Sequence, residues 1–227
     1  MNTNKLKHPH LIHHWGKILI DTNVLIKVLG YRKTGREDFK FYYDLLAHLA
    51  STQYQKSNGT TADRSFFISA ISIAEILERV EEGSKKSQNI IHALNANNVT
   101  VVDFDEDVAD LFNTEFCEVI GKQKMNDLLS KWGESVTKGE RESLTKDIMI
   151  LASGMFMEMD ACLCYDKGLY RIGRECGVNT IYCLPEFFRN SGDTFFEFYA
   201  ANCDKALNTI PKSNGETSGG LFDVAVT

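Results

Sequence analysis

A chain of 227 residues with 43% hydrophobic and 25% charged residues can bury one sizeable core, and its composition is that of an ordinary globular domain rather than a disordered chain. No run approaches the roughly 18 apolar residues of a membrane-spanning helix. The formal net charge of −6 argues against a protein that binds nucleic acid irrespective of sequence, because such proteins are normally basic. Residues 1–17 lack the apolar core of a secretory signal, so we expect a cytoplasmic protein with reduced cysteines.

The stretch Lys17–Ile26, which reads KILIDTNVLI, organises the chain. Ile18–Ile20 form a short apolar run bounded by polar residues, which predicts a strand buried on both faces, as in a parallel sheet. Ligand chemistry in such sheets lies just beyond the carboxyl ends of the strands, which is where Asp21 falls. The alternative for Asp21 is a turn or N-cap role for the segment that begins at Val24.

The next segment, residues 27–38, is rich in cations, and Gly30 and Gly35 predict a loop there. Its cations are either solvated charges or a rim that contacts phosphates beside the first strand. We expect a helix over Phe39–Ala50, followed by a polar loop over Ser51–Arg64.

Phe66–Ile68 predicts the second strand, and Ser69–Glu82 predicts a helix because its apolar residues recur at helical spacing. Ser72 and Glu75 fit a capping box, in which Ser72 caps the helix and Glu75 reaches back to the backbone. This structural role competes with a chemical role for Glu75. Both roles place Glu75 in the first turn, at the same edge of the sheet as Asp21.

The middle of the chain continues the alternation of strands and helices. We expect a helix over Gln88–Asn97, a strand over Val99–Val102 and a helix opened by the acidic trio Asp105–Asp107, whose charges favour a helix N-terminus. Residues 121–139 contain three glycines among mixed charges and predict an insertion or a helical hairpin.

Two further acids follow in similar settings. Leu144–Met159 predicts a helix with Asp147 near its start, where an acid either favours the helix dipole or takes part in chemistry. Ala161–Tyr165 predicts the fourth strand. It ends at Asp166, which is either the N-cap of a helix over Lys167–Glu175 or a site residue.

Asn179–Cys183 predicts the fifth strand, and Thr194–Leu207 a helix packed outside the core. Five strands alternating with helices predict the α/β class, as a three-layer α/β/α sandwich around a central parallel, roughly five-stranded sheet. We expect an N-terminal extension over residues 1–16, one domain over 17–190, and a C-terminal helix and mobile tail over 191–227.

Four carboxylates therefore fall at strand ends and helix starts on one edge of the predicted sheet: Asp21, Glu75, Asp147 and Asp166. They would repel one another unless a cation neutralised them, and hard oxygen ligands select Mg²⁺ or Mn²⁺. Such ions activate water and stabilise the leaving oxygen in displacement at phosphorus, so the pattern predicts hydrolysis of a phosphodiester. An aspartate-nucleophile phosphatase would need a second carboxylate where this chain has Asn23.

This ordered set of acids resembles the PIN-domain family of metal-dependent ribonucleases, from about Lys17 to Tyr182. The resemblance implies a Mg²⁺- or Mn²⁺-dependent endoribonuclease and, as in many bacterial members, the toxin of a toxin–antitoxin pair. It implies that the four acids are both catalytic and metal-binding, with Asp21 as the central ligand. Asn23 and Ser72 would support them or contact the substrate.

The partners that the resemblance implies are RNA, an antitoxin protein and a second copy of the chain, with no membrane. The alternative is a non-catalytic module of the same fold that binds RNA or a protein. Lys167, Arg171 and Arg174 share one face of their predicted helix, where they either hold phosphates or are solvated. The sequence shows no platform on which bases would stack. The full set of candidate RNA-binding residues is Arg32, Lys33, Arg36, Lys167, Arg171 and Arg174.

Overall fold

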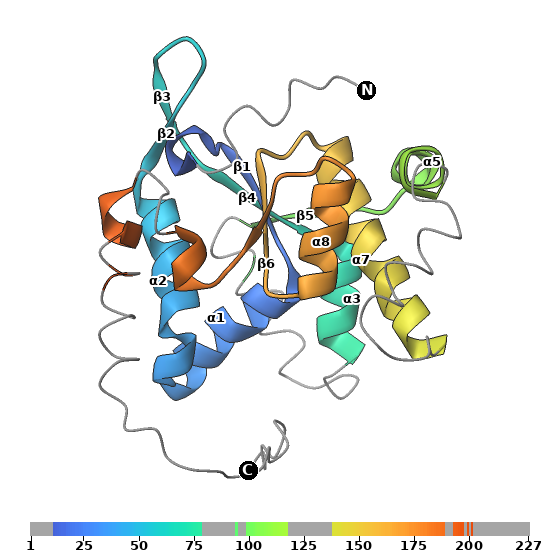
Figure 1. The fold of residues 1–227 in the computed structure, drawn as a ribbon, viewed down its shortest axis with the longest axis horizontal. Helices are drawn as coiled ribbons and strands as arrows, with labels where there is room; N and C mark the ends of the chain where they lie inside the picture. The colour runs from blue at the N-terminus through green and yellow to red at the C-terminus, as the bar shows by residue number, and fades with distance from the viewer. Residues whose placement is uncertain are drawn as a thin grey trace.

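The computed structural model describes residues 11–78, 94, 99–117, 138–188, 193–197, 199 and 201 of the chain. Its centre is a five-stranded sheet in the order β5-β4-β1-β6-β7, and every neighbouring pair is parallel (Figure 1). The predicted α/β class with a central parallel sheet is confirmed. The strands are β1 (Lys17–Ile20), β4 (Ser65–Ser69), β5 (Val99–Val102), β6 (Ala161–Cys164) and β7 (Thr180–Tyr182).

The central strand β1 is buried on both of its faces. Leu19 pairs with Phe67 of β4 on one side and with Cys162 of β6 on the other. Side chains of a strand alternate between faces, so Ile18 and Ile20 enter one core while Leu19 enters the other. This explains why the sequence of β1 is continuously apolar rather than alternating.

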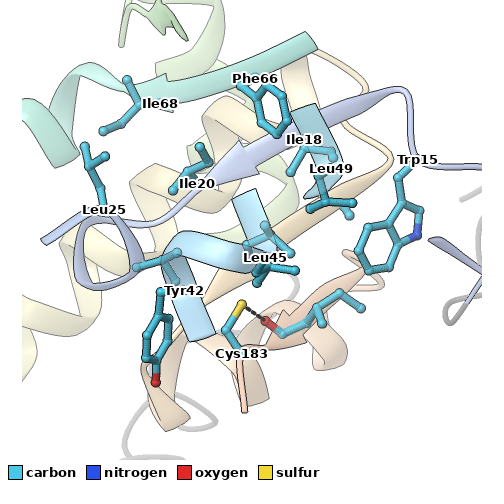
Figure 2. Close-up of a cluster of buried hydrophobic side chains, with 14 of the residues drawn as sticks. Trp15, Ile18, Ile20, Leu25, Tyr42, Leu45, Leu49, Phe66, Ile68 and Cys183 are labelled. Atoms are coloured by element: carbon cyan, nitrogen blue, oxygen red, sulfur yellow. Dashed lines mark hydrogen bonds between the residues drawn. The ribbon is translucent and has the colours of Figure 1, made fainter. Parts of the chain in front are cut away.

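Helices cover both faces of the sheet (Figure 1). One core contains the buried residues of α1 and α2, including Leu45 and Leu49, which pack with Ile18 and Ile20 (Figure 2). The other core contains those of α5, α7 and α8. α3 follows β4 and contacts both α1 and α7. The helices are α1 (Thr22–Thr34), α2 (Glu37–Ser51), α3 (Ala70–Glu78), α5 (Glu106–Leu111), α7 (Lys138–Phe156) and α8 (Lys167–Glu175), with short helical segments η2 (Ile12–His14), η3 (Phe112–Cys117) and η4 (Pro185–Phe188).

The loop predicted over residues 27–38 is wrong, because α1 continues to Thr34. Gly30 lies inside this helix, where a Cβ atom would come within 2.9 Å of the Phe39 ring. Gly30 therefore serves the close packing of α1 on α2 and does not break the helix. Gly35, with φ of 66°, adopts the left-handed conformation that ends α1.

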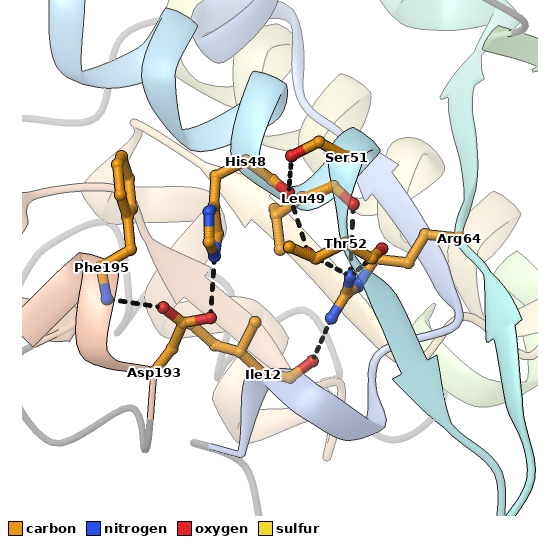
Figure 3. A network of polar contacts seen from close by, with 8 residues as sticks. All are labelled: Ile12, His48, Leu49, Ser51, Thr52, Arg64, Asp193 and Phe195. Atoms are coloured by element: carbon orange, nitrogen blue, oxygen red, sulfur yellow. Dashed lines mark hydrogen bonds and ion pairs between the residues drawn. The ribbon is translucent and has the colours of Figure 1, made fainter.

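The polar loop predicted over Ser51–Arg64 is also wrong in part. It contains a protruding antiparallel hairpin of β2 (Gln53–Gln55) and β3 (Thr61–Asp63). The guanidinium of Arg64 donates to the carbonyl oxygens of Leu49 and Ile12, each at 3.2 Å, which ties the base of the hairpin to α2 and to η2 (Figure 3). A polar two-stranded ribbon lacks the apolar alternation by which strands are predicted from sequence.

Both ends of the described chain contribute to the core. Ile12 and Trp15 are buried, so the described end of the predicted N-terminal extension packs into the core. Phe196 is fully buried in the core beside α2, which corrects the expectation that its helix packs outside. The neighbouring Asp193 pairs with His48 at 2.9 Å, and this interaction fixes the segment to α2 (Figure 3).

Other expectations fall partly or wholly outside the described residues. These include most of the helix over Gln88–Asn97, residues 121–137 of the insertion predicted over 121–139, and residues 202–227 of the predicted C-terminal helix and tail. The division of the chain into an extension, one domain and a C-terminal segment stays a prediction. No helix among the described residues is long and apolar enough to cross a membrane.

Candidate active site

The candidate site lies where the sheet topology reverses. From β1 the chain builds β4 and β5 on one side and β6 and β7 on the other, so β1 and β6 flank the switch point. Open α/β sheets bind ligands in the crevice at this point, beyond the carboxyl ends of the strands. Asp21 follows β1 directly, and its backbone N–H donates to the Leu163 carbonyl of β6 at 2.9 Å. Asp166 follows β6, so the two acids flank the switch point.

Asp21 fills the capping role, one of the two roles that the sequence left open. It is the N-cap of α1, and its Oδ2 accepts a hydrogen bond from the Asn23 backbone N–H at 3.3 Å. It is also only 2% exposed. The pKa of Asp21 is raised from 3.8 to about 7, mainly by burial and also by the charges of Asp166 and Glu75, against the opposing hydrogen bond from Asn23. A residue that only caps a helix does not need to be buried, because a cap at the surface keeps its carboxylate solvated and ionised.

Glu75 is held beside Asp21 by a residue that the sequence analysis missed. Its Oε2 accepts a hydrogen bond from the Thr22 hydroxyl at 2.6 Å, which links α3 to the start of α1. Glu75 lies in the second turn of α3, because that helix begins at Ala70. The only signal for Thr22 in the sequence is that its hydroxyl follows Asp21 directly. The contact between Thr22 and Glu75 arises only in the tertiary structure.

The capping box predicted for Ser72 and Glu75 is wrong. β4 runs into α3 without a loop, and the hydroxyl of Ser69 at the end of the strand accepts a hydrogen bond from the Ile71 backbone N–H at 3.2 Å. Ser72 lies within the helix and is fully buried. Its hydroxyl has no hydrogen-bond partner among the residues that the structure describes.

Asp147 lies in the middle of α7 and not in its first turn, because that helix begins at Lys138. A favourable interaction with the helix dipole falls off beyond the first turn, so this explanation of Asp147 does not hold. The pKa of Asp147 is raised to about 9, mainly by burial and also by the charges of Asp166, Asp21 and Glu75. In the described part of the chain no hydrogen bond or ion pair compensates this carboxyl.

Asp166 is the N-cap of α8, which is one of the two roles predicted for it. Its Oδ1 accepts from the backbone N–H groups of Gly168 at 2.6 Å and Leu169 at 2.9 Å. These bonds fix the orientation of the carboxylate at the mouth of the switch point. Oδ2 takes no part in them, so capping leaves one oxygen available to another ligand.

The four acids act on one another electrostatically: Asp147 is affected by the other three, and Asp21 by Asp166 and Glu75. Within the described ranges, no group of three or more His, Cys, Asp or Glu side chains is arranged so that it could hold a metal ion. Mg²⁺, however, usually keeps several waters and binds through one or two carboxylates. The donor set fits such an ion, because it offers hard carboxylate oxygens, and because the raised pKa values of Asp21 and Asp147 show that ionisation of these two acids is unfavourable without a cation.

The predicted RNA-binding cations lie in two places. Arg32 and Lys33 are exposed in the last turn of α1, about 15 Å along the helix from its start at Asp21. Arg36, beyond them, pairs with Asp38, with Nε to Oδ1 at 3.0 Å. Helix α1 therefore places Arg32, Lys33 and Arg36 away from the acids, and the expectation that they form a rim beside the first strand is wrong. Lys167, Arg171 and Arg174 are exposed on α8, which starts at Asp166.

No protein-family model matches the sequence, and no curated protein matches it significantly. Among solved structures, VapBC2 from Rickettsia felis, bound to a DNA fragment from its promoter, is similar with a TM-score of 0.41. The match has 16% sequence identity and covers 72% of this chain and 96% of that chain. This is a distant likeness of structure alone.

Proposed function

We propose that the chain is a metal-dependent ribonuclease that hydrolyses phosphodiester bonds at Asp21, Glu75, Asp147 and Asp166. The observation that carries the proposal is Asp147, a mid-helix acid whose pKa is raised to about 9 by burial and by three neighbouring carboxylates. Buried charges in proteins are normally paired, and a strongly perturbed, uncompensated acid is a candidate for a functional site. In this proposal, a bound cation offsets the repulsion among the four acids.

Each acid has a distinct part in this proposal. Asp21 is the central ligand at the switch point, Glu75 is oriented by Thr22, and Asp166 is oriented by the first N–H groups of α8. A Mg²⁺ or Mn²⁺ ion held by these carboxylates would supply an activated water and charge stabilisation at the leaving oxygen. Asp21 and Asp147 release their protons when the ion binds, because ligating carboxylates must be deprotonated.

The substrate class rests on the resemblance to PIN-domain ribonucleases, for which RNA is the usual substrate. The same resemblance supports an antitoxin partner and self-association as further proposals. The competing function is a non-catalytic module of this fold that binds RNA or a protein. Binding of the ion distinguishes the ribonuclease from the non-catalytic module, because the module is not expected to bind Mg²⁺ or Mn²⁺.

The first test is stabilisation by the ion. An ion that binds only the folded state at 100 times its dissociation constant adds about 2.7 kcal/mol. For a domain of this size that corresponds to a rise in Tm of roughly 5 to 10 °C. We expect this rise with millimolar Mn²⁺ or Mg²⁺ by differential scanning fluorimetry, together with cleavage of a mixed RNA pool that EDTA abolishes. An unmoved melting curve and an intact RNA pool would favour the inert module.

A second test concerns the RNA path. Changing both Lys167 and Arg171 to Gln should weaken RNA binding for all sequences alike and flatten its salt dependence, by about 0.7 in log–log slope for each phosphate that the variant no longer neutralises. The matched control changes Arg32 and Lys33 to Gln, which removes the same charge at the far end of α1. Binding measured by fluorescence anisotropy across a salt series decides the question. Equal slopes in the wild type and the α8 variant would place the RNA elsewhere.

A further inference from the structure

Four aromatic side chains lie together at the carboxyl ends of β6 and β7: Tyr165, Tyr170, Tyr182 and Phe187, here called the aromatic rim. Tyr165 and Tyr182 are stacked, with ring centroids 5.5 Å apart and planes at 7°. Phe187 meets Tyr182 at 5.4 Å and Tyr170 at 5.8 Å, both nearly perpendicular. The four residues come from the end of β6, the first turns of α8, the end of β7 and η4.

The aromatic rim and the acids occupy the same edge of the sheet. Tyr165 immediately precedes Asp166, and the Tyr170 backbone N–H donates to the Asp166 carbonyl at 3.0 Å. Tyr182 ends β7, and Phe187 follows it in η4. Asp166 follows β6, and neighbouring strands lie about 4.8 Å apart. The rim therefore lies within roughly one to two strand widths of β6.

The exposure of Phe187 distinguishes the aromatic rim from core packing. Its side chain is 43% exposed although two tyrosines hold the ring in place. A fixed, exposed aromatic ring offers a surface for stacking at little cost in conformational entropy. Its neighbours Tyr165 and Tyr170 are themselves only partly buried.

Cations lie at both ends of the aromatic rim. The Lys27 ammonium is 4.2 Å from the centroid of the Tyr165 ring. The Arg174 guanidinium is 5.8 Å from that of Tyr170, and its Nη1 donates to the Tyr170 hydroxyl at 3.2 Å. Aromatic rings between cations match single-stranded nucleic acid, whose bases stack on rings while its phosphates meet positive charge.

We propose that the aromatic rim stacks the bases of single-stranded RNA next to the four acids, with Phe187 as its exposed platform. This inference rests on the proposed function, for which it defines the substrate as an unpaired strand. Stacking tolerates every base, because each has a π face, so the rim selects unpaired RNA without reading its sequence. Base stacking of this kind changes affinity by about 5- to 150-fold per base on alanine substitution.

The experiment compares two labelled probes in EDTA, so that no cleavage occurs: a single-stranded oligouridylate and an abasic ribose-phosphate oligomer of the same length. Wild-type protein should bind the oligouridylate at least about five-fold more tightly than the abasic oligomer. Phe187→Leu, which keeps an apolar side chain against the tyrosines, should lose this preference. Phe187→Trp should keep it, and the added indole fluorescence should be quenched by the oligouridylate alone.

Phe156→Leu is the matched control, because Phe156 is 42% exposed at the end of α7, on the opposite edge of the sheet. It should bind both probes as the wild type does. If Phe187→Leu keeps the full preference for bases while Mn²⁺ still raises Tm and RNA is still cleaved, the stacking inference is wrong and the proposed function stands. If the ion has no effect and neither probe binds, both are wrong.

Discussion

Asp21→Asn is expected to reduce RNA cleavage by more than about 100-fold, the upper end of the reduction seen when a residue that only supports a metal ligand is changed. The substitution keeps the shape of the side chain and removes its charge from the switch point between β1 and β6. The fold should be retained, because Asn caps helices as well as Asp does and can still accept from the Asn23 N–H. Removing a buried acid whose pKa is raised to about 7 should even stabilise the metal-free protein.

The measurement is the cleavage rate of a mixed RNA pool with Mn²⁺, with circular dichroism to establish the fold. Asp107→Asn is the matched control, because it makes the same change of charge at an exposed position in the first turn of α5. The control should cleave at the wild-type rate. Wild-type activity in Asp21→Asn would refute the assignment of this residue as the central ligand.

Asp147→Asn is expected to raise the stability of the metal-free protein by about 2 to 4 kcal/mol near pH 8. The pKa of Asp147 is raised from 3.8 to about 9, so between these values the folded state binds more protons than the unfolded state. Stability from this group is therefore fully present below pH 3.8 and is lost as pH rises to about 9. Asp21 gives the same trend up to pH about 7. Asn does not ionise and avoids this loss.

Urea unfolding in EDTA at about pH 5 and about pH 8 measures the effect, because the free energy of unfolding changes with the protons bound. The difference between Asp147→Asn and the wild type should be small at the lower pH and large at the higher one. The stabilisation by Mn²⁺ should be smaller in the variant than in the wild type. A variant less stable than the wild type at the higher pH would show that Asp147 serves the fold and not a charge cluster.

The sequence predicted the elements whose cause is local. The apolar runs of β1 and β6 are continuous because both faces of a central parallel strand are covered, and this pattern is visible residue by residue. Asp21 and Asp166 follow these two strands, so their presence at one edge of the sheet follows from the alternation of strands and helices. The two acids cap helices, which is one of the two roles that the sequence left open for each, because capping depends only on the next few backbone N–H groups.

Tertiary contacts decided what sequence patterns could not. Gly30 continues a helix instead of ending it because the Phe39 ring occupies the space of its missing side chain. Ser69 replaces Ser72 as the cap of α3 because the strand passes directly into the helix. Thr22 reaches Glu75 across 53 positions of the chain. Each of these features depends on a residue distant in sequence or on the path of the backbone. Local sequence propensity carries no information about either.

The candidate site also has some features that follow from the sequence and others that follow from the tertiary structure. That four acids occur at strand ends and in helices is a property of the sequence, and so is the chemistry of their oxygens. That Asp147 lies half-buried in mid-helix with its pKa raised is a property of the packing of α7 against the sheet, because desolvation and Coulomb repulsion act through space. The aromatic rim is likewise invisible in the sequence, since its four rings come from separate segments that only the ends of parallel strands bring together.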